Sequence, residues 1–245
     1  MIKKIFLTLI TNLSGVIHIL IGTPLILSHY GIDTLGLNSA LLIILTIMTI
    51  IDFGIPAIAS REVAKAKKSE RKNVVKKFIQ IAICQWIFMF MMGSSITAIY
   101  LMMILDANGI MYNTNVVIPH LNLSIFWGIA IASTATLAVF ANMLISMNRS
   151  VKTNFIRLTL TIIIILGLFV VTYNSLSVEY YYYIYSLTTF SAVFILHLFL
   201  CDGYRLKIHQ FYKHLATTKA DILSIIPKSK NLLRYYEHDG DFSFR

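Results

Sequence analysis

The chain has 245 residues, of which 57% are hydrophobic and only 13% are charged, and its formal net charge is +10. This composition lies well outside the range of ordinary soluble proteins. It excludes a soluble globular domain and predicts a chain that lies mostly in lipid.

Six apolar segments are long enough to cross a membrane. A hydrocarbon core about 30 Å thick needs roughly 20 apolar residues per helix, and lipid requires each segment to satisfy its own backbone hydrogen bonds. In chain order, the expected spans are 5–27, 37–59, 78–105, 121–147, 158–173 and 181–200. We therefore expect an all-α integral membrane protein with a six-helix transmembrane bundle over 1–204 and a basic cytoplasmic tail over 205–245.

The positive charges predict the orientation of these spans. All 21 Lys and Arg residues lie at 3–4, 61–77, 149–157 and 205–245, which the six spans place on one side of the membrane. The opposite loops have no Lys or Arg and carry Asp33, Asp106 and Glu179. Short loops rich in Lys and Arg stay in the cytoplasm, so both termini are predicted to be cytoplasmic.

The same basic residues indicate which partners to expect. They would attract anionic membrane lipids, and this accounts for the net charge without nucleic acid, which we do not expect as a partner. The segment 61–77 has two compatible interpretations, an orientation signal and a short amphiphilic helix on the inner leaflet.

Polar side chains inside the first span are the first candidates for a functional site. The small and polar residues that share one helical face, with Asn12 beside them, are Thr11, Ser14, Gly15, His18 and Gly22. Small residues allow helices to pack closely in lipid, so one interpretation is a packing face. In the other, Asn12 and His18 line an aqueous cavity, where only His18 could titrate near neutral pH.

The second span contains an acid, Asp52, about 22 Å from its outer end at 1.5 Å per residue. An unpaired carboxylate at that depth would cost at least about 2.5 kcal/mol, so it must be neutral, paired or hydrated. Gly54 and Pro56 weaken the helix just beyond it, and we expect a bend there. A structural cap and a gating or ion-coupling acid both remain open. Arg61 could pair with Asp52 only across that bend.

Other polar positions carry weaker signals. The tyrosine run 180–183, with Tyr185, is typical of the membrane interface, and a sugar-stacking platform is the alternative. We expect most hydroxyl groups in the remaining spans to form interhelical hydrogen bonds. Cys84 and Cys201 are not placed for a disulfide or a metal site, and no cofactor is expected.

One segment resembles a known family. The residues that carry the resemblance are Pro24, Tyr30-Gly31, Gly36-Leu37, Ile51 to Ile55 and Ala59 to Ala64. Together they resemble the N-terminal signature of O-antigen and capsular polysaccharide flippases, in the exporter superfamily that includes MATE-type drug transporters. The resemblance implies a multi-pass transporter, not an enzyme, that moves an undecaprenyl-diphosphate-linked oligosaccharide across the bacterial inner membrane.

The resemblance also implies site residues and partners. Asp52, Gly54 and Arg61 fall on matching positions, so the substrate or gating candidates are Asn12, His18, Asp52 and Arg61. Such flippases are built from two lobes, and this sequence corresponds to one, so a second lobe or a homodimer partner is expected. The alternatives are an inactive truncated remnant and a non-catalytic membrane subunit of a polysaccharide assembly complex.

Overall fold

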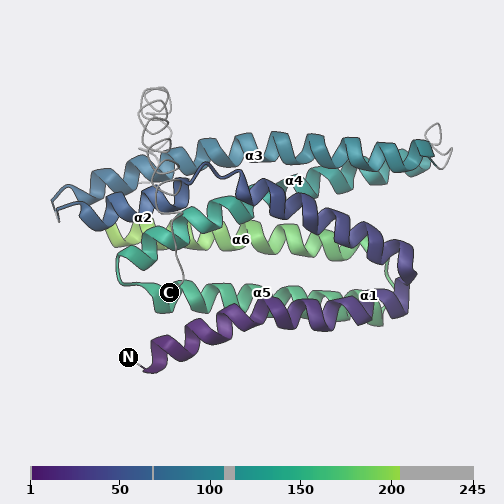
Figure 1. Cartoon of the computed structure of the whole chain (residues 1–245), viewed down its shortest axis with the longest axis horizontal. Coiled ribbons are helices and arrows are strands. Elements are labelled where there is room, and N and C mark those ends of the chain that lie inside the picture. Colours follow the sequence, from purple (N-terminus) through teal and green to yellow (C-terminus); the bar gives the residue numbers. More distant parts are fainter. Residues whose placement is uncertain (1, 68, 108–113, 205–245) are drawn as a thin grey trace, which may run out of the picture.

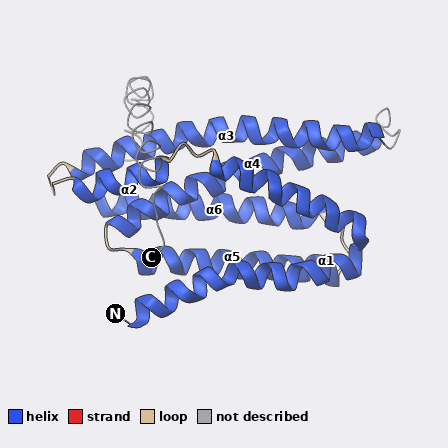
Figure 2. Ribbon diagram, in the orientation of Figure 1, coloured by secondary structure: helices blue, strands red, loops and turns tan. Residues whose placement is uncertain are grey.

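The computed structural model describes residues 2–67, 69–107 and 114–204, without the side chains of 2–8, 12, 14–15, 114–118 and 202–204. The described residues form α-helices and no strand (Figure 2). Five of these helices contain a stretch that is long and apolar enough to span a membrane. The chain is therefore all-α, as expected, and its helices indicate a multi-pass membrane protein.

The first helix, α1 (Ile2–Ile50), is folded back on itself. Figure 1 shows it running the length of the bundle, turning, and returning toward its starting end. The turn lies at Gly31, where φ is 82° and ψ is −179°, a conformation that glycine adopts readily. Its apolar stretch, Leu9–Ile50, has 42 residues, about twice the length needed for one crossing. We call residues 2–30 the first arm and 32–50 the second arm.

A sharp turn separates α1 from the short helix α2 (Ile55–Lys65). Phe53 and Gly54 both have left-handed backbone angles, with φ of 57° and 67°. Pro56 lies in the first turn of α2, where its missing N–H costs no hydrogen bond. The helix is amphipathic: Ile58, Ala59 and Val63 are buried, while Arg61 is exposed.

Four long helices complete the bundle: α3 (Arg71–Ala107), α4 (Thr114–Ser146), α5 (Ser150–Tyr173) and α6 (Glu179–Tyr204). Helix α4 lies at the centre, because 72% of the residues in its apolar stretch are buried, against 22% in those of α3 and α5. Large apolar side chains on the outer helices face away from the protein, and Met103 is 67% exposed. Such a surface is typical of a protein embedded in lipid.

Helices α3 and α4 approach each other most closely at Gly128. A Cβ atom at this position would overlap the Ser94 side chain and lie 3.0 Å from its backbone nitrogen. One turn and a half along α4, Ser133 accepts a hydrogen bond of 3.3 Å from Trp86 Nε1 on α3. Small residues allow this close contact, and van der Waals packing is a main source of helix association in lipid.

The expected spans agree with these helices except in the second span. Segments 78–105, 158–173 and 181–200 lie inside α3, α5 and α6, and 121–147 lies inside α4 except for its last residue. The expected span 37–59 is wrong at its end, since the helix stops at Ile50. The bend expected near Gly54 is confirmed, and it is sharp enough to make residues 55–59 part of α2.

The expectation of one short helix over 61–77 is also wrong. The amphipathic helix ends at Lys65, and α3 begins at Arg71. The two helices are separated by a turn around residues 66–70, where the backbone N–H of Arg71 donates to the carbonyl of Lys67 over 2.9 Å. The tail 205–245 lies outside the described residues.

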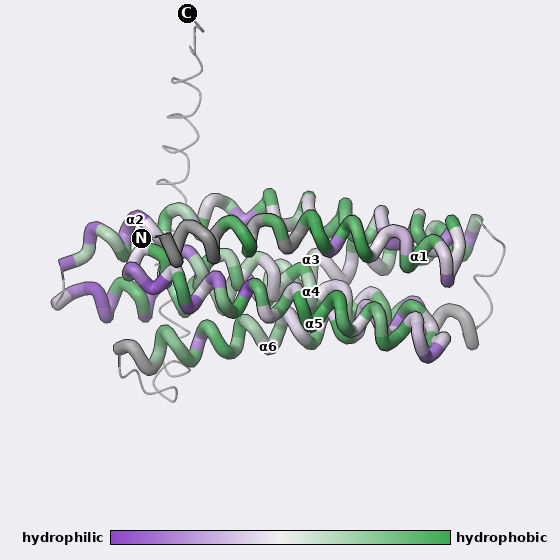
Figure 3. The backbone as a smooth tube through the Cα atoms, turned by 90° about the horizontal axis from the view of Figure 1, so that it is seen from below, coloured by the Kyte–Doolittle hydropathy of each residue, from purple (hydrophilic) through white to green (hydrophobic). Residues whose placement is uncertain are grey.

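Hydrophilic residues gather at one end of the bundle, around α2 and the start of α3 (Figure 3). The described cations of α2, of the turn after it and of the first turns of α3 and α5 are Arg61, Lys65, Lys67, Arg71, Lys72, Lys76, Lys77, Arg149 and Lys152, and Arg157 lies further along α5. Asp33 and Asp106 lie toward the opposite end, next to the α1 turn and at the end of α3 (Figure 1). The described helices therefore bring the basic stretches together, as the charge pattern requires.

Candidate functional site

A cavity of about 310 Å³ lies between the two arms of α1 and α6. His18 and Thr23 of the first arm line it, together with Asn38 and Ser39 of the second arm and Tyr181 of α6. Three segments that are distant in the sequence thus bring polar groups to one space. Because polar groups are rare in transmembrane segments and face the bundle interior, their convergence marks this cavity as a candidate site.

His18 is held by a long-range hydrogen bond. Its Nε2 atom lies 2.8 Å from the hydroxyl of Tyr181, and the two rings are tilted by 45° with centroids 6.4 Å apart. Tyr181 is only 3% exposed. A neutral imidazole can either donate or accept this bond, and the tautomer decides which.

The face of the first span contacts both a cavity and another helix. His18 lines the cavity, and an aqueous role for it stays a hypothesis. Its neighbours pack against α5, because Thr11 Oγ1 donates to the Asn154 carbonyl over 3.3 Å. A Cβ at Gly22 would lie 3.5 Å from Leu168, also on α5. Asn12 is part of α1, and its side chain is outside the described part of the chain.

A buried aromatic group supports the second arm from behind the cavity. The Tyr182 hydroxyl donates to Asn38 Oδ1 over 3.4 Å, and Trp127 Nε1 donates to the Leu41 carbonyl over 3.0 Å. The Trp127 and Tyr182 rings meet edge to face, with centroids 5.4 Å apart. These contacts fix the second arm, and therefore Asn38, against α4 and α6.

Two tyrosines of the run are buried within the protein, and the place of the run at the membrane interface stays a prediction. Tyr181 and Tyr182 are 3% and 0% exposed, whereas Tyr180 is 52% exposed. Packing against Trp127 buries the inner pair, and their hydroxyls bond to His18 and Asn38. The run therefore cannot offer a row of open rings for sugar stacking.

Asp52 lies in the turn after Ile50, outside the five apolar spans. Its Oδ1 atom accepts a hydrogen bond of 2.8 Å from the backbone N–H of Gly54, which stabilises the left-handed pair that precedes α2. Partial burial raises the pKa of its carboxyl above the ordinary value, and the hydrogen bond from Gly54 opposes this shift. The Asp52 carboxyl thus has a local structural contact, and its gating or ion-coupling role stays a hypothesis.

Arg61 and Asp52 are separated by the fold. Arg61 lies on the exposed face of α2, whereas the Asp52 carboxylate is turned to the backbone of its own turn. Within the described residues the two form no ion pair, and neither lines the cavity around His18. Arg61 is instead placed among the cations at the basic end of the bundle.

The expectation that most other hydroxyls form interhelical hydrogen bonds is wrong. Thr188, Thr189 and Ser191 each donate to a carbonyl four residues earlier in their own helix. Ser186 is an exception, since it also donates to the Phe126 carbonyl on α4 over 2.7 Å, and Ser133 is another, since it accepts from Trp86 on α3. A hydroxyl that bonds within its own helix needs no partner on another helix, so sequence position alone does not reveal which kind forms.

Sequence reasoning missed Asn38 and the role of Tyr181. Asn38 lies at the edge of the expected second span, where a polar residue is unremarkable. Tyr181 belongs to a run with an interfacial signature. The signal that could have found them is a polar residue close to an intramembrane histidine. That closeness becomes visible only once the two arms of α1 are packed against α6.

The cavity offers hydrogen-bonding groups and one imidazole. Within the described residues, no group of three His, Cys, Asp or Glu side chains is placed to hold a metal ion. No family model matches the chain, and neither does any curated protein or solved structure. The function of this protein is therefore inferred from the geometry of the cavity and from the resemblance over residues 22–64.

Proposed function

We propose that this protein is a membrane transporter that moves a lipid-linked oligosaccharide, carried on undecaprenyl diphosphate, across the bacterial inner membrane for surface polysaccharide synthesis. One observation carries the proposal: residues 24–64, the segment that contains the resemblance, pass from the cavity through the Asp52 turn into helix α2. Ile26, Leu35 and Asn38 of this segment line the cavity, and the residues that carry the resemblance lie beside and beyond them in the sequence. A segment that joins a polar cavity to a cationic helix at the end of the bundle supports transport more than it supports a purely structural role.

The proposed topology has six crossings, with each arm of α1 counted separately and both termini in the cytoplasm. Each arm is long enough for one crossing, and the fold reverses direction at Gly31. The basic end of the bundle then faces the cytoplasm, in accord with the tendency of Lys and Arg to remain there.

The proposed mechanism begins with electrostatic attraction at the basic end. Arg61 and Lys65 are exposed on α2, and clustered cations near a membrane surface attract phosphate groups. The diphosphate of the substrate would meet these cations while its prenyl tail stays in the bilayer. Rocking of one helical bundle against another would then expose the headgroup to the opposite side.

The size of the cavity favours a partner. Its volume of about 310 Å³ is at the lower end of the range of small-molecule pockets, so it cannot enclose an oligosaccharide. We propose that it forms part of one wall of a larger path, completed by a second lobe or by a second copy of this chain.

Transport in proteoliposomes tests the proposal. The full chain would be reconstituted with undecaprenyl-diphosphate-linked oligosaccharide, and the sugar reaching the opposite leaflet would be measured with a membrane-impermeant glycosidase. Arg61→Ala is expected to slow transfer about fivefold, as the loss of about 1 kcal/mol of phosphate attraction implies.

Arg61→Lys is the matched control, because it preserves the charge at the same position of α2. It should retain most of the transfer rate at equal protein abundance. No transfer by the wild-type chain, alone and after addition of a candidate partner lobe, would refute the proposal. Equal rates for Arg61→Ala and wild type would remove Arg61 from the mechanism.

A further inference from the structure

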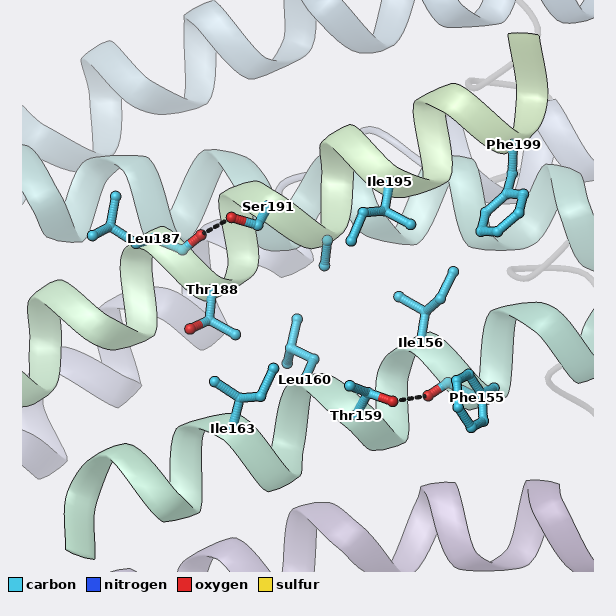
Figure 4. A pocket seen from close by; sticks show the side chains of 11 residues that line it. Phe155, Ile156, Thr159, Leu160, Ile163, Leu187, Thr188, Ser191, Ile195 and Phe199 are labelled. Atoms are coloured by element: carbon cyan, nitrogen blue, oxygen red, sulfur yellow. Dashed lines mark hydrogen bonds between the residues drawn. The ribbon is translucent and has the colours of Figure 1, made fainter. Parts of the chain in front are cut away.

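An apolar groove lies between α5 and α6 (Figure 4). Its volume is about 440 Å³. The buried Ala192 and the half-buried Leu160 form its base, and its edges include Phe155 and Leu187, which are 63% and 55% exposed. The groove is therefore open along the outer surface of the bundle, on a side that faces lipid.

The walls of the groove offer no free hydrogen-bond donor. Its hydroxyl groups belong to Thr159, Thr188 and Ser191. Each donates to the carbonyl four residues earlier in its own helix, over 3.0, 2.6 and 2.8 Å respectively, and two of these bonds are drawn in Figure 4. A polar ligand would therefore find no hydrogen-bond donor in the groove, whereas a hydrocarbon chain needs none.

The groove has the length of one leaflet. Its lining on α5 runs from Phe155 to Ile163, which is about 12 Å along the helix at 1.5 Å per residue. Half of a hydrocarbon core about 30 Å thick is roughly 15 Å. The groove extends from the basic end of the bundle toward the middle, so it fits a chain that belongs to that leaflet alone.

Two cations lie at the basic end of this groove. The Lys152 ammonium is 5.1 Å from the centre of the Phe199 ring, and Arg149 Nη1 donates to the Phe199 carbonyl over 3.4 Å. Phe199 itself lines the groove. Lys152 is exposed, and within the described residues neither cation is paired with an acid.

We propose that the α5–α6 groove is a binding site for an anionic phospholipid of the leaflet at the basic end, with one acyl chain in the groove and its phosphate at Lys152 and Arg149. An apolar slot that ends in cations matches a hydrocarbon chain attached to an anionic headgroup, and basic pockets between transmembrane helices bind such lipids. If a second copy of this chain occupied the groove, the apolar lining would be used, but no anion would be needed beside Lys152 and Arg149. The inference does not depend on the transport proposal, which concerns residues 22–64.

Native mass spectrometry of the full chain in detergent tests the charged end. Phosphatidylglycerol and phosphatidylcholine with identical acyl chains would be titrated separately. Wild type should hold one phosphatidylglycerol more tightly, and Lys152→Gln should weaken that binding about fivefold. Lys72→Gln is the matched control, because Lys72 is also an exposed lysine in the first turn of its helix, and it should leave binding unchanged.

Filling the groove tests the apolar part. Thr188→Trp places a large ring between α5 and α6 and should reduce the retention of both lipids. Thr46→Trp is its control, since Thr46 is exposed on α1 and makes the same kind of bond, to the Leu42 carbonyl over 2.8 Å. Equal helicity and elution volume of the variants would show that they are folded.

Three results would overturn the proposal. One is equal phosphatidylglycerol affinity in wild type and Lys152→Gln. Another is a Thr188→Trp variant that keeps its lipid. A Thr188→Trp variant that changes its oligomeric state instead would also overturn the proposal, because the groove would then be a protein interface. For the case in which Thr188→Trp does not fold, a phosphatidylglycerol with a photoreactive acyl chain should label 155–163 or 187–199 of the wild-type chain, and labelling only elsewhere would also refute it.

Discussion

The Nε2 atom of His18 and the hydroxyl oxygen of Tyr181 lie 2.8 Å apart, although 163 residues separate them in the chain. This bond joins the first arm of α1 directly to α6 and closes one side of the polar cavity. In lipid, a polar group that loses its partner cannot turn to water. The pair is therefore both a structural tie and the wall of the candidate site.

Tyr181→Phe should reduce the free energy of unfolding by about 1 kcal/mol, because it removes one buried hydrogen bond and leaves the imidazole without its partner. Unfolding by denaturant in detergent micelles would measure the change. Tyr180→Phe is the matched control, since Tyr180 is the exposed neighbour. Similar losses in both variants would show that the hydroxyl bond to His18 contributes nothing.

Gly128→Ala should destabilise the bundle by about 1–3 kcal/mol, the usual cost of overpacking, because the new Cβ would overlap Ser94 on α3. Gly36→Ala provides the comparison. Gly36 lies in the second arm of α1 and has no atom within 4 Å of the Cβ position, so alanine should not destabilise it. The apparent melting temperature of the two variants in detergent would decide, and a Gly128→Ala variant as stable as wild type would contradict the close packing of α3 and α4.

The long helices could be predicted from local sequence, because each contains a long apolar run without a cation. The end of the second span could not. There the chain places Phe53 at φ 57°, which a bulky side chain rarely adopts, and the hydrogen bond between Asp52 and Gly54 stabilises the turn. Gly54 and Pro56 indicated a weak point, but not that the helix would stop four residues earlier.

The candidate site was predictable only in part. A histidine in an apolar span indicated function or a buried partner by itself, whereas the identity of that partner depends on how α1 and α6 pack. The tyrosine run shows the same limit, since its local pattern favours the interface and its inner residues are buried against Trp127. Tertiary packing, which no local pattern contains, decides between these outcomes.

The six-crossing topology predicts which cysteines an impermeant thiol reagent can reach in intact cells. In a background of Cys84→Ser and Cys201→Ser, Asn174→Cys should be labelled from outside, because residue 174 is exposed between α5 and α6. Lys67→Cys, exposed between α2 and α3, should be labelled only after permeabilisation. Labelling of Lys67→Cys in intact cells would reverse the orientation and remove the basis for a cytoplasmic substrate entrance.

Asp52→Asn should remove the contribution of this carboxyl to the pH dependence of stability. Burial raises the pKa of the folded-state carboxyl above its ordinary value of 3.8, so the folded state binds the proton more tightly than the unfolded state. The contribution of this group to stability is then greatest at low pH and falls as the pH rises from that ordinary value through the raised one. Asparagine keeps the oxygen that accepts the Gly54 hydrogen bond and cannot ionise, so the stability of the variant relative to wild type should increase over the same range.

The apparent melting temperature of both proteins, measured in detergent between pH 3 and pH 8, tests this directly. Asp52→Asn should match wild type at the acidic end and exceed it at neutral pH. A variant that is less stable than wild type at neutral pH would show that the ionised carboxylate has a favourable partner. The same variant also separates the two roles of Asp52, because normal transport at normal abundance would leave it a cap, whereas a folded, stable and inactive protein would require its proton in the transport cycle.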